Sequence, residues 1–249
     1  MTRGIGEIYL KTMRKHFRKR ANWKPGRAMN LGDYGILTKK GYFSKMGNIS
    51  KDFDIKFEIE QDDSADDVEQ FCSKKGFEIV WRAKGDVTPG GFKFLKAGVS
   101  INFAKKEAVF VDANGCRYDQ ITNIPALGEK IVERYNKGSG KWKKRYVLVT
   151  EVERAEGATI VVTHGDSASI DIEAKVDGPI GSISDTGLGL KVARTSNIGY
   201  RIVARKGLKL MMETMRIHDS LLDKTKVKPL GGKRGRKKKR QISLELWLD

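Results

Sequence analysis

The chain has 249 residues, 39% of them hydrophobic, and it carries a net charge of +18. This composition can bury a core, and its two separated cysteines, Cys72 and Cys116, exclude a disulfide framework and a CxxC zinc site. No apolar stretch approaches the roughly 18 residues of a transmembrane helix or the about 7 to 15 residues of a signal-peptide core. We therefore expect a protein of the reducing cytoplasm.

Fifteen of the 49 Lys and Arg residues lie in two short segments that contain no acid. The first segment contains Lys11, Arg14, Lys15, Arg18, Lys19, Arg20, Lys24 and Arg27. The second contains Lys233, Arg234, Arg236, Lys237, Lys238, Lys239 and Arg240. Without them, 34 cations would face 31 Asp and Glu residues, a net charge of +3. A nearly neutral body with a cationic segment near each end predicts a polyanionic partner, either nucleic acid or an anionic membrane.

Residues 5 to 20 are predicted to form a basic amphipathic helix, because Ile5, Tyr9 and Met13 recur at helical spacing among the cations. Two interpretations are open. The apolar side can pack on the protein, or the helix can lie in a membrane interface or along a phosphate backbone. The cations that would bind phosphate or lipid are Lys11, Arg14, Lys15, Arg18, Lys19 and Arg20.

Short strands and tight turns are predicted for the glycine-punctuated residues 31 to 49. Apolar and charged residues then alternate from Phe53 to Glu60, which predicts a strand with one wet face. A short helix is predicted over residues 65 to 75, with Ser64 as its N-cap and Gly76 as its end.

Strands are predicted at residues 77–83, 92–95, 98–103 and 107–112, and a helix from Pro125 to Tyr135. Helices and strands do not alternate as they do in a parallel α/β sheet. The predicted fold class is therefore α+β, with a curved, mainly antiparallel sheet and two or three short helices.

The clearest pattern lies between Tyr146 and Val176, where an antiparallel meander of three strands is predicted with turns at Glu156-Gly157 and at residues 164–166. Its third strand presents apolar residues on one face, alternating with polar ones. These apolar residues are Ala168, Ile170, Ile172, Ala174 and Val176. Further strands are predicted at residues 188–195, 198–205 and 208–215.

After Leu222 the sequence becomes polar and basic, and only residues 242–248 recover an alternating pattern that suits a terminal strand. Three regions are predicted. They are the basic helix in residues 1–27, a single α+β domain in residues 28–222 and a basic tail in residues 223–249.

Catalysis is not indicated. His16, His164 and His218 stand in no metal-ligand or nucleophile motif, so we predict neither an enzyme nor a metal site nor a cofactor.

The alternating strands favour a membrane function. A strand that crosses a bilayer needs about 9 to 11 residues with one apolar and one polar face, which residues 168–176 satisfy. A half-buried sheet of an ordinary domain shows the same alternation. The competing hypothesis is nucleic-acid binding, in which both cationic segments bind phosphates without strong sequence specificity. A third alternative is an interaction protein whose basic ends dock on an acidic partner.

The order of elements resembles that of the bacterial gasdermins. The resemblance rests on the basic N-terminal element, the glycine-rich strands at residues 31–49, and the strands at 146–152 and 158–162. It implies membrane-pore formation by hairpins that refold from a sheet. The chain differs from that family in having no cysteine near its N-terminus for acylation and no evident inhibitory domain.

The function predicted is therefore that of a non-enzymatic, pore-forming effector on anionic lipid, cytoplasmic and recruited to the membrane. The helix at residues 5–20 would bind lipid, the strands at 145–176 would insert, and residues 223–249 would hold the closed form. The predicted partners are an anionic membrane or nucleic acid, together with further copies of the chain. Nothing in the sequence indicates a small-molecule substrate.

Overall fold

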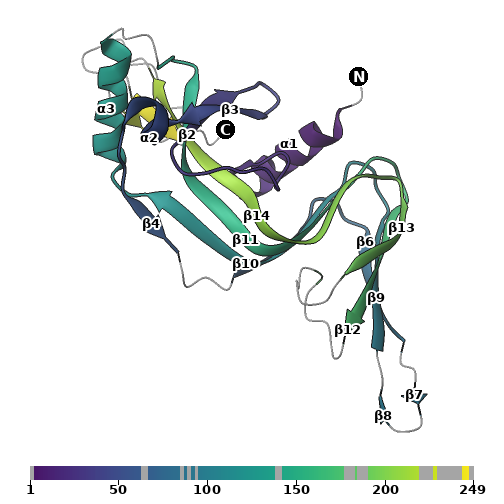
Figure 1. The fold of residues 1–249 in the computed structure, drawn as a ribbon. Helices are drawn as coiled ribbons and strands as arrows, with labels where there is room; N and C mark the ends of the chain where they lie inside the picture. The colour runs from purple at the N-terminus through teal and green to yellow at the C-terminus, as the bar shows by residue number, and fades with distance from the viewer. Residues whose placement is uncertain are drawn as a thin grey trace. The chain divides into compact units, whose positions relative to one another are not determined.

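The protein is described by a computed structural model of the chain (Figure 1). The structure describes residues 3–62, 67–84, 87–88, 91–92, 95–137, 142–176, 183, 190–218, 227–228 and 243–246. These residues form three helices and mainly antiparallel sheets. The predicted α+β class with a curved antiparallel sheet is therefore confirmed.

The helices are α1 (Ile5–Phe17), α2 (Ile49–Phe53) and α3 (Ile124–Asn136). The first ten strands are β1 (Arg20–Ala21), β2 (Asp33–Leu37), β3 (Phe43–Asn48), β4 (Ile59–Gln61), β5 (Asp67–Cys72), β6 (Phe77–Lys84), β7 (Val87–Thr88), β8 (Gly91–Phe92), β9 (Leu95–Phe103) and β10 (Val109–Ile121). The remaining strands are β11 (Tyr146–Thr163), β12 (Ala168–Val176), β13 (Lys191–Ser196), β14 (Ile198–His218), β15 (Val227–Lys228) and β16 (Ser243–Leu246).

The chain divides into two compact units, each with its own apolar core. Unit 1 contains residues 1–12, 64–117 and 154–208. Unit 2 contains residues 13–63, 118–153 and 209–249. The long strands β10, β11 and β14 contribute residues to both units. The limits of the predicted α+β domain, at residues 28 and 222, remain a prediction from the sequence.

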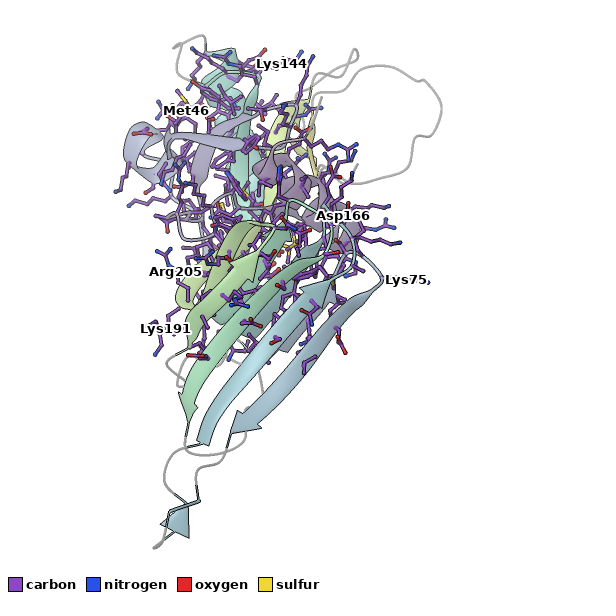
Figure 2. The ribbon with its side chains drawn as sticks, turned by 90° about the vertical axis from the view of Figure 1, so that its right-hand side faces the viewer. Met46, Lys75, Lys144, Asp166, Lys191 and Arg205 are labelled. Carbon is purple, nitrogen blue, oxygen red and sulfur yellow. The ribbon has the colours of Figure 1, made fainter. Side chains whose placement is uncertain are left out.

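Unit 1 contains a four-stranded antiparallel sheet with the strand order β13-β12-β9-β6, which Figure 2 shows side by side. Strands β12 and β9 pair along nine residues, from Ala168 opposite Phe103 to Val176 opposite Leu95. Alternation along the strands gives the sheet one apolar face, because successive side chains point to opposite sides. That face packs into a core formed by Val99, Ile101, Phe103, Ala108, Phe110, Val161, Ala168, Ile170, Ile172 and Ile183.

Unit 2 is built around a group of aromatic side chains. The ring of Tyr34 lies 5.1 Å from that of Phe53, 5.5 Å from Trp142 and 5.3 Å from Tyr146. Aromatic rings at such separations add about 0.5 to 1.5 kcal/mol to the free energy of unfolding beyond the area they bury. Helix α3 packs Leu127 and Ile131 against this group, and its predicted position at residues 125–135 is confirmed.

The glycine-punctuated segment forms the hairpin of β2 and β3, which a buried carboxylate secures. Asp33 accepts hydrogen bonds from the backbone NH of Asn30 and the side-chain amide of Asn48, and Lys45 Nζ lies 2.8 Å from Asp33 Oδ2. Gly35 is needed for the close approach of the strands, since a Cβ there would lie 2.1 Å from the carbonyl oxygen of Ser44.

Two local predictions are wrong. Residues 67–72 form strand β5 instead of a helix, because they pair with β10 from Phe110 to Cys116. The strand predicted over residues 53–60 is shortened to β4 by helix α2, which ends where Asp54 adopts a left-handed conformation with φ 53°. In both cases a short amphipathic segment fits either structure, and its neighbours decide between them.

The predicted meander of residues 146–176 is also wrong. Strand β11 runs from Tyr146 to Thr163 without a turn at Glu156-Gly157, and Gly157 is buried within it. Strand β12 pairs with β9 and β13 instead of β11. Likewise, the two strands predicted at residues 198–205 and 208–215 are one strand, β14, in which Gly207 supplies a positive φ of 65°.

Candidate membrane-contact surfaces

Helix α1 is amphipathic as predicted, and its apolar side is buried in the protein. Ile8, Tyr9, Leu10 and Met13 are 0 to 5% exposed. Ile5 packs so closely on Gly199 of β14 that a Cβ at Gly199 would lie 2.3 Å from the Ile5 side chain. In this conformation the helix therefore presents its polar side, and not its apolar side, to the surroundings.

The predicted anion-binding cations of the first segment fall into two groups. Lys11, Lys15 and Arg18 are exposed, whereas Arg14 and Lys19 are half-buried and Arg20 is buried. The helix ends at Phe17, three residues earlier than predicted, because Arg18 adopts a positive φ of 59° and Arg20 enters strand β1. The exposed residues remain candidates for binding phosphate.

Lys19 binds acidic side chains of the same chain. Its Nζ donates a hydrogen bond of 2.6 Å to Glu151 on β11 and lies 3.8 Å from Glu153, whose side chain is 1% exposed. It also stands 4.2 Å from the ring centroid of Tyr118, a cation–π distance. Three contacts from β10 and β11 therefore engage the charge of Lys19 inside unit 2.

Arg20 is held in strand β1, which pairs with β14 through Arg20 opposite Met212. Burial lowers the pKa of Arg20 to about 10, and the positive charges of Arg14 and Arg216 contribute to this decrease. On β14, burial raises the pKa of Glu213, repulsion from Glu151 raises it further, and Lys19 opposes both effects. Lys19 and Arg20 are therefore held within unit 2 by a charged network that involves β11 and β14.

The second cationic segment lies outside the described residues, so the structure places none of its seven predicted phosphate-binding side chains. The strand that follows it, β16, is described. It pairs antiparallel with β14 from Met215 opposite Leu246 to His218 opposite Ser243.

Strand β12 contains the predicted inserting residues. Ala168, Ile170 and Ile172 are buried at 0 to 2% exposure. Ala174 and Val176 belong to the same strand, but their side chains lie outside the described part of the chain. The inserting hairpin predicted over residues 145–176 is not formed, because β11 and β12 do not pair with each other.

The opposite face of the four-stranded sheet is polar. Ser100 of β9 donates a hydrogen bond of 2.6 Å to Asp171 of β12. Asp171 is opposite Arg194 in the register of β13, and Glu173 is opposite Lys191. Pairs of opposite charge across neighbouring strands favour this register.

Sequence reasoning missed the partners of β12, which are β9 and β13. A signal was present in β9, where Leu95, Ala97, Val99, Ile101 and Phe103 alternate with polar residues or glycine. Two short strands were predicted there, at residues 92–95 and 98–103. The structure instead joins two hairpins, β6-β9 and β12-β13, into one amphipathic sheet.

In comparisons with known proteins, no family model and no curated protein matches this chain. Within the described residues, no helix is both long enough and apolar enough to cross a bilayer. The same part of the chain holds no group of three or more His, Cys, Asp or Glu side chains arranged to bind a metal ion.

Proposed function

We propose that this chain is a non-enzymatic effector that binds anionic membranes and forms pores, with the sheet of β6, β9, β12 and β13 as the inserting element. The observation that carries the proposal is the continuous register between the two inner strands of this sheet, β9 and β12. Strands β9 and β12 pair along nine residues each, with apolar side chains on one face and polar side chains on the other.

The length of these strands suits a bilayer. Nine residues at about 3.3 Å per residue extend roughly 30 Å, which is the thickness of the hydrocarbon core. Two hairpins in one sheet also satisfy the backbone hydrogen bonds of the inner strands, a condition that any strand must meet in lipid.

Insertion requires the apolar face to exchange its protein contacts for lipid. Ile101, Ile170 and Ile172 are fully or almost fully buried against a core that includes Phe110 and Val161. The state described here is therefore the closed state of the proposed effector. Pore formation then requires a rearrangement and further copies of the chain.

Electrostatic attraction would bring the protein to the membrane. Lys11 and Lys15 are four residues apart on α1 and both are exposed, so they lie on one side of the helix. Each cation near an anionic leaflet contributes about 1 kcal/mol to binding. The same cations would also bind the phosphates of nucleic acid. Charge alone therefore does not distinguish membrane binding from nucleic-acid binding.

The test follows two neighbouring positions of β12 into the membrane. In a Cys72→Ser, Cys116→Ser background, Ser169→Cys and Ile170→Cys each receive an environment-sensitive fluorophore, and the proteins are mixed with phosphatidylserine-containing vesicles. We expect a quencher attached to the lipid chains to reach the label at 170 but not the label at 169. An aqueous quencher should give the reverse result.

Dye release from the same vesicles measures pore formation, with neutral vesicles and duplex DNA as controls. Equal quenching at both positions, together with no dye release, would contradict insertion by this sheet. Salt-sensitive binding to DNA without any binding to vesicles would instead support the nucleic-acid alternative.

A further inference from the structure

Two pairs of lysines that are 31 residues apart in sequence meet at one end of the four-stranded sheet of unit 1. Lys74 and Lys75 lie between β5 and β6, and Lys105 and Lys106 follow β9. Figure 2 labels Lys75 at this end of the sheet. We call these four residues the lysine cluster.

Backbone hydrogen bonds bring the two turns together. The NH of Ala104 donates to the carbonyl oxygen of Gly76 at 2.8 Å, directly beside the register pair Phe77 and Phe103. Gly76 has a φ of 82°, which favours glycine, and a Cβ there would lie 3.2 Å from that of Ala104. The NH of Lys106 donates to Asp166 at 2.9 Å, which fixes the second turn.

The side chains of the lysine cluster are not engaged by acidic side chains of the described residues. All four side chains are exposed, and none forms an ion pair with another described residue. Of the acids beside them in sequence or hydrogen bonding, Glu78 of β6 is exposed, Glu107 is 3.8 Å from Arg3, and Asp166 accepts the NH of Lys106. Four like charges held at one end of a sheet repel one another unless an anionic partner binds them.

An exposed aromatic side chain lies next to these charges. Phe77, the first residue of β6, is 40% exposed and follows Lys75 by two positions. Lysines together with aromatic rings at the ends of strands are typical of the boundary between lipid and water. In addition, this cluster stands at the end of strands whose nine residues fit a bilayer.

We propose that the lysine cluster is a docking surface for the phosphate-bearing headgroups of anionic lipids. This inference rests on the proposed function and adds to it the residues that hold one end of the sheet at the membrane surface. Phe77 favours lipid over nucleic acid as the anion, because its exposed ring enters the headgroup boundary while the lysines contact phosphate.

The test removes the four charges and compares the result with removal of four equally exposed charges elsewhere. The cluster variant is Lys74→Gln, Lys75→Gln, Lys105→Gln and Lys106→Gln. The control variant is Lys39→Gln, Lys51→Gln, Lys56→Gln and Lys130→Gln, all exposed lysines of unit 2 without a described ion pair. Binding is measured by cosedimentation with phosphatidylcholine vesicles that contain or lack phosphatidylserine, at one ionic strength.

We expect the cluster variant to bind the anionic vesicles at least about tenfold more weakly, and the control variant to lose less than about threefold. Equal losses in both variants would overturn the inference, because net charge alone would then explain binding. Thermal unfolding of both variants checks that they fold.

The two proposals fail in different ways. If the natural chain does not bind anionic vesicles, both fall. If it binds them and the cluster variant binds equally well, only the lysine cluster falls. If the cluster variant keeps vesicle binding but loses binding to duplex DNA, the cluster is a nucleic-acid surface and the lipid assignment is wrong.

Discussion

Strand β12 of unit 1 is buried on one face, whereas the beginning of β11 in unit 2 is buried on both faces. In β12, Ile170 and Ile172 are buried while Asp171 between them is half-buried and polar. In β11, the consecutive residues Leu148 and Val149 are both buried, and they pack into two separate apolar clusters. Alternation therefore marks a strand with one wet face, and a continuous apolar run marks a strand covered on both faces.

Alanine substitutions at neighbouring positions test this difference with the largest expected effect. Ile170→Ala should lower the free energy of unfolding by about 2 to 5 kcal/mol, whereas Ser169→Ala should change it by less than about 0.5 kcal/mol. Leu148→Ala and Val149→Ala should both cost more than about 1 kcal/mol, because both positions are buried. Urea unfolding measures all four values. Similar costs at positions 169 and 170 would contradict the one-sided burial of β12.

The ion pairs of the two units offer a second comparison. Lys19→Met removes the cation beside Glu151 and the buried Glu153, and we expect a loss of about 1 to 3 kcal/mol in the free energy of unfolding. Arg117→Met breaks the pair with Glu156, whose side chain is 62% exposed, and should cost less than about 1 kcal/mol. Equal losses in urea unfolding would show that the Lys19 network does not stabilise unit 2.

The smallest effect concerns the pH dependence of stability. Because the pKa of Glu213 is raised in the folded state, its contribution to stability is fully present below the ordinary value of 4.5 and is lost as the pH rises through the raised value. Glu213→Gln should therefore stabilise the protein at neutral pH, and this gain should disappear as the pH falls toward 4.5. Thermal unfolding between pH 4 and 8 measures it.

Glu133→Gln is the matched control for this prediction. Lys137 donates a hydrogen bond to the carboxylate of Glu133 and lowers its pKa, so Glu133→Gln should not stabilise the protein at neutral pH. An unchanged pH profile for Glu213→Gln would contradict the half-buried position of that carboxyl group.

Two periodic segments were predictable from the sequence, whereas a short segment and the full extents of β11 and β14 were not. The pattern of Leu127 and Ile131 predicted helix α3, and the alternation around Ile170 predicted β12. Residues 67–72 satisfied a helix pattern, but the hydrogen bonds offered by β10 made them a strand. A local pattern of six residues stabilises neither structure enough to resist such pairing.

The candidate surfaces show the same limit. The sequence identified the cationic residues 11–20, yet only the fold shows that Lys19 pairs with acids on β11 while Lys11 and Lys15 face outward. The sequence also contains no signal that would place Lys75 near Lys105. That proximity depends on the hydrogen bond between the turns that contain Gly76 and Ala104.

The sequence by itself determined the α+β class, the amphipathic faces of α1 and β12, and the concentration of positive charge, because these depend on residue types at local spacing. The tertiary structure decided which strands pair, that β11 continues through Glu156-Gly157, and which cations remain exposed. Those features depend on contacts between residues distant in the chain, whose hydrogen bonds and burial outweigh local preference.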